Sequence, residues 1–263
     1  MDLGIKGNTA IVTASSSGLG KASASALLKE GVNVVINGRN EEKLLNTAHE
    51  LREIGGGEVF AVKGDLTKKE DIKELVEKTY QKFERIDHLV TSAGGPPVAS
   101  FEETEDDDWY FAFDLLVMSV VRLVRESLDY LRRDGGGTIV NITSRSVKEA
   151  IDGLLLSNSV RMSVVGLMKT LSRELAPEIR ANAILPGSHE TNRIKNIIES
   201  QLERGEFDSY DEALDFRSKN IPFKRLGKPE ELGDLVAFLS SGKSSYINGT
   251  AVVIDGGGSR SNL

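Results

Sequence analysis

Cysteine is the most informative absence in this sequence. None of the 263 residues is a cysteine, which excludes disulfide bonds, thiolate nucleophiles and cysteine-ligated metals. Histidine is also scarce, because only His49, His88 and His189 occur and they are scattered along the chain. No metal site is therefore expected.

A basic excess and a long apolar run are lacking as well. The formal net charge is −7 at pH 7, whereas a nucleic-acid-binding protein carries a basic face. No apolar run reaches the roughly 18 residues that a membrane-spanning helix needs, and the first residues do not read as a signal peptide. We expect a cytoplasmic protein that binds neither nucleic acid nor membrane.

What the sequence does have is a regular alternation of short apolar runs and longer amphipathic stretches. Alternation of this kind is typical of right-handed βαβ units, which build a parallel sheet with helices on both faces. With no visible linker, the pattern predicts a single doubly wound α/β domain over residues 1–263, with a seven-stranded Rossmann-type sheet. The expected strands are Thr9–Thr13, Val32–Asn37, Val59–Lys63, His88–Ser92, Thr138–Ile142, Arg180–Leu185 and Ala251–Ile254. The expected helices are Gly18–Glu30, Glu41–Ile54, Lys69–Phe83, Asp107–Arg132, Ser157–Leu175 and Glu230–Leu239.

One segment interrupts this alternation. Residues 188–221 are polar, charged and too long for a plain loop, since long loops without secondary structure are uncommon in compact domains. We expect a pair of helices there, forming a lid over the site.

A glycine-rich turn, Thr13–Gly20, joins the first expected strand to the first expected helix. Its glycines let the backbone approach a pyrophosphate, and the helix N-terminus supplies aligned N–H groups. The strand before the turn and the helix after it make this the fingerprint of a dinucleotide site. The residues expected to contact the dinucleotide are Thr13, Ser15, Ser16, Ser17, Gly18, Leu19 and Gly20.

The end of the second strand bears on which dinucleotide binds. An acidic residue in this place binds the ribose 2′-hydroxyl of NAD. This chain has Gly38 there, followed by Arg39, and a guanidinium suits a phosphate through bidentate, charge-assisted bonds. We expect NADP, with NAD as the alternative; a solvated surface charge is the other interpretation of Arg39.

Taken together, the motifs resemble the short-chain dehydrogenase/reductase family, and specifically its 3-oxoacyl-acyl-carrier-protein reductase branch. The resemblance covers nearly the whole chain. It rests on the segments Thr13–Gly20, Gly64–Leu66, Thr91–Gly95, Ile139–Ser144, Asn182–Gly187, Arg225–Glu231, Ile247–Gly249 and Asp255–Gly257.

The resemblance implies further contacts with the cofactor. Asp65 and Leu66 would flank the adenine, and Ala93, Gly94 and Gly95 would lie at the cofactor ribose. It likewise implies that Pro186 and Gly187 pack near the nicotinamide, that Thr191 bonds its carboxamide, and that the protein is a homodimer or homotetramer.

Two positions of the cofactor site depart from the family pattern. Ala14 replaces the first glycine of the turn, which carries a penalty of about 1 kcal/mol if the position needs a positive φ. Thr91-Ser92 replaces an Asn pair that braces the central strands. These changes are expected to loosen the site without abolishing it.

The catalytic positions depart more strongly. The family reduces carbonyls with a Ser, a Tyr, a Lys one helical turn after the Tyr, and an Asn. Ser144 stands at the Ser position, but Ser157 takes the Tyr position, Arg161 the Lys position and Leu116 the Asn position. A Ser hydroxyl is a much weaker acid than a Tyr, and Arg cannot exchange protons because its pKa exceeds about 12. Arg161 can still bond ribose hydroxyls and supply positive charge.

His189 is the candidate for a replacement acid. It follows Pro186-Gly187-Ser188 beside the expected nicotinamide, and histidine titrates near neutral pH. The alternative is a polar lid residue whose side chain points outward. Glu190 and Tyr210 are weaker candidates.

Three functions remain open. The first is an NADP(H)-dependent oxidoreductase that acts on a small carbonyl or alcohol substrate with a non-standard site. The second is a catalytically inactive dinucleotide-binding regulatory or partner protein. The third, a lyase or isomerase, is favoured by no feature of the sequence.

Overall fold

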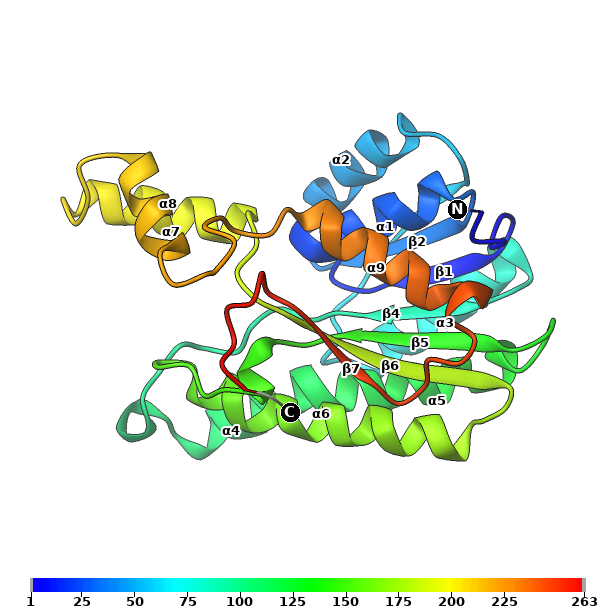
Figure 1. The fold of residues 1–263 in the computed structure, drawn as a ribbon. Helices are drawn as coiled ribbons and strands as arrows, with labels where there is room; N and C mark the ends of the chain where they lie inside the picture. Colours follow the sequence, from blue (N-terminus) through cyan, green and yellow to red (C-terminus); the bar gives the residue numbers. More distant parts are fainter. Residues whose placement is uncertain (1, 262–263) are drawn as a thin grey trace.

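A seven-stranded parallel sheet with the order β3-β2-β1-β4-β5-β6-β7 forms the centre of the computed structural model, which describes residues 2–261 (Figure 1). The order reverses between β1 and β4, and a crevice for ligands opens beyond the carboxyl ends of strands at such a switch point. The predicted doubly wound α/β fold is therefore confirmed. The strands are β1 (Thr9–Val12), β2 (Asn33–Gly38), β3 (Val59–Lys63), β4 (His88–Thr91), β5 (Gly137–Ile142), β6 (Ile179–Pro186) and β7 (Ala251–Ile254).

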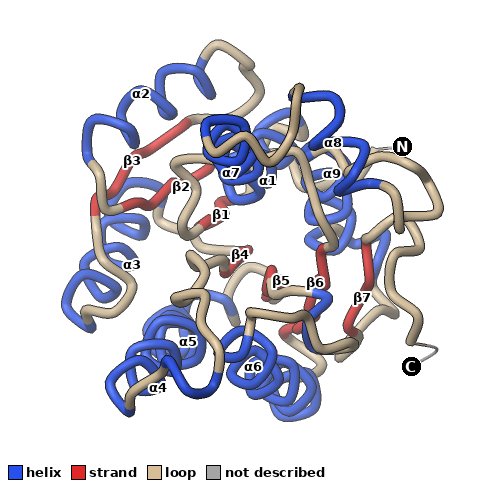
Figure 2. The backbone as a smooth tube through the Cα atoms, turned by 90° about the vertical axis from the view of Figure 1, so that its left-hand side faces the viewer, coloured by secondary structure: helices blue, strands red, loops and turns tan. Residues whose placement is uncertain are grey.

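Helices cover both faces of the sheet. Figure 2 shows α3, α4, α5 and α6 on one side and α1, α2 and α9 on the other. The helices are α1 (Gly18–Lys29), α2 (Glu41–Arg52), α3 (Lys69–Phe83), α4 (Asp106–Phe113), α5 (Ser119–Leu131), α6 (Leu155–Glu174), α7 (Asn192–Glu203), α8 (Tyr210–Ser218) and α9 (Pro229–Ser240).

The sheet separates two apolar cores, because successive side chains of a strand point to opposite faces. In β1, Ile11 belongs to the core beneath α3, α5 and α6, whereas Ala10 and Val12 belong to the core beneath α1 and α9. All four residues of β1 are buried. Burial on both faces explains why the central strands read as continuous apolar runs.

The long helix predicted over Asp107–Arg132 is interrupted. A π-helical turn, η2 (Asp114–Met118), lies between α4 and α5. Ser119 donates a hydrogen bond back to the carbonyl of Leu115 at 2.5 Å. The turn places Leu116, which is 3% exposed, in the core against α6. The apolar periodicity of the segment is helical throughout, so it gave no signal for the widened turn.

The segment 188–221 contains the expected pair of helices, α7 and α8, which pack on each other. Ile198 of α7 and Ala213 of α8 are fully buried. In Figure 1 the pair stands away from the sheet at the carboxyl ends of the strands. Its action as a lid stays a prediction. Within residues 2–261, no helix is both long enough and apolar enough to cross a membrane.

Candidate active site

The turn between β1 and α1 has the backbone that a dinucleotide site needs. Gly18 has a φ of 57°, and Ala14 has a φ of 48°. The positive φ at Ala14 carries strain of about 1 kcal/mol, which a glycine would not. Gly20 is indispensable, because a Cβ there would lie 2.6 Å from the carbonyl oxygen of Ala14.

Hydroxyl groups hold this turn to the neighbouring strands. Thr13 Oγ1 donates to the carbonyl of Ser92 at 2.7 Å and accepts from the Ser92 N–H at 2.8 Å. Ser15 Oγ donates to the carbonyl of Val12 at 2.6 Å and accepts from the N–H of Asn37 at 3.0 Å. Thr13 and Ser15 were predicted to contact the dinucleotide. Both are buried, and their hydroxyls form hydrogen bonds with the protein backbone that fix the shape of the turn.

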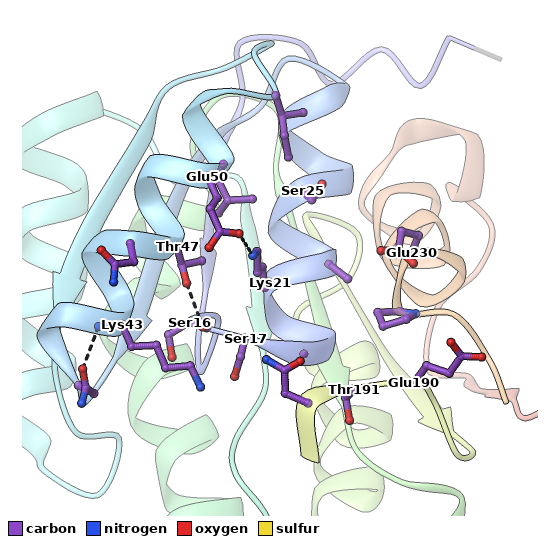
Figure 3. A pocket seen from close by; sticks show the side chains of 18 of the residues that line it. Ser16, Ser17, Lys21, Ser25, Lys43, Thr47, Glu50, Glu190, Thr191 and Glu230 are labelled. Atoms are coloured by element: carbon purple, nitrogen blue, oxygen red, sulfur yellow. Dashed lines mark hydrogen bonds and ion pairs between the residues drawn. The ribbon is translucent and has the colours of Figure 1, made fainter. Parts of the chain in front are cut away.

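The next residues of the turn face open space. Ser16, Ser17 and Gly18 line a cavity of about 730 Å³ between α1 and α2 (Figure 3). Lys43, in the first turn of α2, lines the same cavity, and its amine reaches toward Ser16 and Ser17. Asn40 fixes the start of α2 by accepting the Lys43 N–H at 2.9 Å. The sequence analysis missed Lys43, whose signal was its place in the helix that follows Arg39.

The end of β2 lies beside the turn. A Cβ on Gly38 would come within 3.0 Å of Ser16 Oγ, so the position has little room for an acidic side chain. Arg39 is exposed, and its charge helps to lower the pKa of Asp65. The two predicted residues therefore lie close to each other across the carboxyl ends of β2 and β3.

Asp65 is oriented by its surroundings. Burial acts to raise the pKa of Asp65, but hydrogen bonds from Thr67 and the charge of Arg39 outweigh it and hold the pKa below its ordinary value. Thr67 gives both its N–H and its hydroxyl to Asp65 Oδ1, at 3.0 and 2.9 Å. Leu66 is 8% exposed and its side chain belongs to the core, so its predicted contact with the adenine would have to come from its backbone.

At the end of β4, where the family pattern has an Asn pair, a side chain from β5 braces Thr91 instead. Asn141 Nδ2 donates to Thr91 Oγ1 at 2.7 Å. Ala93 follows half-buried, and Gly94 and Gly95 are exposed at the edge of the crevice. The substitution therefore leaves the central strands tied together.

The predicted catalytic residues Ser144, Ser157 and Arg161 come together in a hydroxyl cluster. Arg161 Nε donates to Ser157 Oγ at 3.1 Å, which is the i to i+4 contact of one face of α6. Ser157 Oγ lies 3.4 Å from Ser146 Oγ, and the N–H of Ser146 donates to Ser144 Oγ at 3.1 Å. Ser157 and Arg161 are 8% and 9% exposed. Ser146, which the sequence analysis did not single out, links the two halves of the cluster.

Pro186 ends β6, and Gly187 and Thr191 follow it. The N–H of Gly187 donates to Ile254 on β7 at 2.9 Å. Thr191 precedes α7 and lies against Gly18, since a Cβ on Gly18 would meet Thr191 Cγ2 at 3.6 Å. The start of α7 therefore packs on the glycine-rich turn.

His189 lies at the N-terminal end of the 188–221 segment and faces Gly227. Its Nδ1 contacts the Gly187 carbonyl at 3.0 Å, and a Cβ on Gly227 would come within 2.7 Å of its Nε2. His189 is 4% exposed and lines a cavity of about 130 Å³ with the Arg225–Glu231 ion pair. The ring packs on Gly227, and its buried Nε2 has no hydrogen-bond partner among the described residues. Its role as the replacement acid stays a prediction.

The N-terminal end of the 188–221 segment is hydrogen-bonded to the chain just beyond its C-terminal end, and we call this junction of Ser188–Glu190 with Gly227 the neck. Glu190 N–H donates to the Gly227 carbonyl at 2.9 Å, and Gly227 N–H donates to the Ser188 carbonyl at 3.0 Å. The Arg225 guanidinium donates two hydrogen bonds, of 2.9 and 2.6 Å, to the carboxylate of Glu231 on α9. Hydrogen bonds from Arg225 and from the Lys228 N–H lower the pKa of Glu231 to about 2.

No group of three or more His, Asp or Glu side chains in the described part of the chain is placed to hold a metal ion. The candidate site thus consists of a glycine-rich turn, Lys43 on the cavity at Ser16, Arg39 near Asp65, and a cluster of hydroxyls with one guanidinium.

Comparisons with known proteins agree with this architecture. Residues 13–259 match a family described as enoyl-(acyl carrier protein) reductase. An oxidoreductase of Bacillus subtilis is 35% identical, with 98% of each chain covered. The 3-oxoacyl-acyl-carrier-protein reductase of Thermotoga maritima is 32% identical, with 96% of this chain and 98% of the relative covered.

Solved structures are similar over the whole fold. The L-sorbose reductase of Gluconobacter frateurii, complexed with NADPH and L-sorbose, has a TM-score of 0.94 at 32% identity, covering 99% of this chain and 100% of that one. An NADPH-bound short-chain oxidoreductase of Pseudomonas aeruginosa that contains an atypical catalytic center has a TM-score of 0.89 at 29% identity, covering 96% and 97%. On these matches, together with the motifs and the sheet order, the chain belongs to the short-chain dehydrogenase/reductase family of oxidoreductases.

Proposed function

We propose that this protein is an NADP(H)-dependent oxidoreductase that interconverts a carbonyl and an alcohol at the Ser144–Ser157–Arg161 cluster. The observation that carries the proposal is the 3.1 Å hydrogen bond from Arg161 to Ser157. It joins the two substituted positions into one polar unit beside Ser144. Both side chains are buried, at 8% and 9% exposed, so the pair lies inside the site and not on the surface.

The preference for NADP rests on charge. Lys43 lines the same cavity as Ser16, the exposed Arg39 follows Gly38, and Gly38 offers no carboxylate to repel a 2′-phosphate. Phosphate recognition by such cations uses charge-assisted hydrogen bonds. The similar L-sorbose reductase and the Pseudomonas aeruginosa oxidoreductase are NADPH complexes, which supports the same choice here.

Each catalytic group has a distinct part. NADPH, when bound, supplies a hydride. Ser144 and Ser157 donate hydrogen bonds to the substrate oxygen, and Arg161 provides the positive charge that stabilises an oxyanion in a partly buried site. Arg161 also bonds the cofactor ribose, as the resemblance implies.

A second function, a non-catalytic dinucleotide-binding protein, is favoured by one observation. Leu116 is 3% exposed at the position of the family Asn, so no polar side chain there relays a proton. The two functions differ in whether bound NADPH is ever oxidised.

The first test is a fluorescence titration of the purified protein with NADPH and, separately, with NADH. Binding of NADPH at least about tenfold tighter than NADH, a difference of about 1.4 kcal/mol, would support the roles of Arg39 and Lys43. Oxidation of bound NADPH by any carbonyl would then rule out the non-catalytic function. If neither nucleotide binds at millimolar concentration, the oxidoreductase function is wrong.

The assembly and the lid belong to the same proposal. The helices α4 and α6 expose large apolar side chains, namely Tyr110, Phe111, Phe113 and Met162 at 41–70%. These side chains support a homodimer or homotetramer built through the two helices, which sedimentation would test. Residues 1–263 then form one domain whose segment 188–221 closes over the substrate.

A further inference from the structure

Arg122 on α5 joins two segments that lie far apart in the sequence. Its Nη1 donates a hydrogen bond to the carbonyl of Thr67 at 3.1 Å, and its Nη2 donates to Asp114 Oδ1 at 2.7 Å. Thr67 lies in the loop between β3 and α3, whereas Asp114 begins the π-helical turn η2. The side chain of Arg122 is only 20% exposed. One guanidinium therefore ties the loop after β3 to the widened turn between α4 and α5.

The Thr67 loop is the adenine end of the expected cofactor site. Thr67 donates its N–H and its hydroxyl to Asp65 Oδ1 at 3.0 and 2.9 Å, and the Asp65 N–H donates to Asp71 Oδ2 at 2.7 Å. Asp65 and Leu66 are the residues that the family resemblance places at the adenine. Hydrogen bonds to charged groups are stronger than those between neutral groups, so the loop holds one shape. A nucleotide that binds Asp65 therefore fixes the Thr67 carbonyl, to which Arg122 is bonded.

The turn at the other end of this bridge has two alternative hydrogen-bonding patterns. In η2 the N–H of Ser119 donates to the carbonyl of Asp114, five residues back, and its hydroxyl donates to the carbonyl of Leu115 at 2.5 Å. An α-helical turn would direct the same N–H to Leu115, four residues back. Turns of the π type are rare and occur mostly as single bulges at functional sites. The bond from Arg122 to the Asp114 carboxylate thus holds the first residue of a turn that can change its pattern.

The π-helical turn packs against α6, the helix that carries Ser157 and Arg161. Leu116 of η2 is 3% exposed and lies in the same core as Leu156 and Val160, which are 0% and 6% exposed. These two core residues are the sequence neighbours of Ser157 and Arg161. Protein interiors are close-packed and transmit strain, so the pattern adopted by η2 affects the position of the first turns of α6.

We propose that Arg122 is a positioning residue that couples the two ends of the cofactor site. An adenine nucleotide bound at the Asp65–Thr67 loop stabilises the π pattern of η2, and through it the place of Ser157 and Arg161 at the nicotinamide end. The proposal rests on the proposed NADP(H)-dependent function. Coupling between two sites is reciprocal and amounts to about 5- to 150-fold in affinity. It requires an element with two states that both sites bias, and η2 is that element.

The test divides the cofactor into two unlinked fragments. Adenosine 2′-monophosphate carries the adenine end, and reduced nicotinamide mononucleotide, which is fluorescent, carries the nicotinamide end and the only 5′-phosphate. In the parent protein, saturation with adenosine 2′-monophosphate should lower the Kd of the reduced mononucleotide at least about fivefold. In Arg122→Leu each fragment should still bind, but the Kd of the reduced mononucleotide should no longer depend on the other fragment. Arg125→Leu, an exposed position on the same helix, should behave as the parent.

Hydrogen exchange reports on the turn directly. Adenosine 2′-monophosphate alone should slow the exchange of the amides of residues 114–119 in the parent and in Arg125→Leu, but not in Arg122→Leu. Asp114→Asn is nearly isosteric and keeps the bond to Thr67, so it should fold, bind the nucleotide and lose most of this protection. A merely structural Arg122 would raise the free energy of unfolding and both fragment affinities above those of the Leu variant, and would leave the coupling between the fragments unchanged.

The outcomes separate this proposal from the proposed function. The coupling proposal is wrong if adenosine 2′-monophosphate changes neither the Kd of the reduced mononucleotide nor the exchange of residues 114–119 in the parent, or if Arg122→Leu retains both effects. If the reduced mononucleotide binds too weakly to measure, the exchange result decides alone. Binding of NADPH by the parent would leave the oxidoreductase function standing in either case, whereas failure to bind NADPH at millimolar concentration would overturn that function.

Discussion

The candidate site has a cofactor half, around the glycine-rich turn, and a catalytic half, around Ser157 and Arg161. Substitutions relative to the family pattern have different consequences in the two halves. In the cofactor half, Thr91 replaces an Asn, but Asn141 from the next strand braces it at 2.7 Å. In the catalytic half, Ser157 and Arg161 bond each other, and Ser157 is a far weaker acid than the Tyr of the family pattern. Dinucleotide binding depends mainly on backbone geometry and helix N–H groups, which many side chains can support. Proton transfer requires a group of a particular pKa, and packing cannot supply it.

The largest expected effect lies in the catalytic half. Arg161→Leu should lower kcat/KM about 10²- to 10³-fold, as loss of one oxyanion-stabilising group does. The Kd for NADPH should change less than about tenfold, because one ribose hydrogen bond contributes about 1 kcal/mol. Steady-state kinetics and fluorescence titration would measure both, with Arg173→Leu as the control. Equal losses in both quantities would contradict the separation of the two halves.

The second expected effect is the pH dependence of stability, which arises at His88, outside both halves of the site. Burial lowers the pKa of His88 to about 4, so the folded protein keeps this imidazole neutral while the unfolded chain protonates it near pH 6.5. The free energy of unfolding is therefore unaffected by His88 above pH 6.5. It decreases by about 3 kcal/mol as the pH falls toward 4, because the unfolded chain takes up the proton first.

Urea unfolding at pH 7.5 and pH 5 would measure this loss, which should be about 2 kcal/mol at pH 5. His88→Gln should remove that part of the pH dependence. If the variant and the parent lose the same stability on acidification, the assignment to His88 is wrong.

In the cofactor half the expected effect is on nucleotide choice. Arg39→Ala should weaken NADPH binding about ten- to a hundredfold and leave NADH binding unchanged, because a hydrogen bond to a charged group contributes about 1.5–3 kcal/mol. Lys43→Ala should act in the same direction with a smaller effect. Lys29→Ala, an exposed position at the end of α1, is the control. A parallel loss of NADH affinity would show that Arg39 does not read the 2′-phosphate.

The smallest effect tests strain in the turn. Ala14→Gly should raise the free energy of unfolding by about 0.5–1 kcal/mol, since glycine adopts the φ of 48° without strain. Ala22→Gly, inside α1, should lower it by about 1 kcal/mol. Urea unfolding of the two variants should therefore give shifts of opposite sign.

The fold was predictable because its signals are local and repeated. The apolar runs of β1 and β2 are buried on both faces, and the glycine-rich turn lies between a strand and a helix as expected. The family assignment from these motifs is confirmed. The π turn at Leu116 was not predictable, because five residues of apolar and acidic character fit an ordinary helix equally well.

In the candidate site, only contacts between residues at a regular spacing in the sequence could be predicted. The interval from Ser157 to Arg161 is one helical turn, so their contact could be foreseen. The orientation of His189 could not, because it depends on Gly227, which is distant in sequence. Ser146 and Lys43 were missed because neither occupies a position that the family motif marks.

The neck at Ser188–Glu190 and Gly227 has an evolutionary consequence. The two points where the chain leaves and rejoins the Rossmann domain are hydrogen-bonded to each other there. The segment between these points is therefore anchored independently of its own length. Its length and composition can change while the strands on either side keep their register. Under the proposed lid role, exchange of α7 and α8 alone would change the substrate range without a change in the sheet.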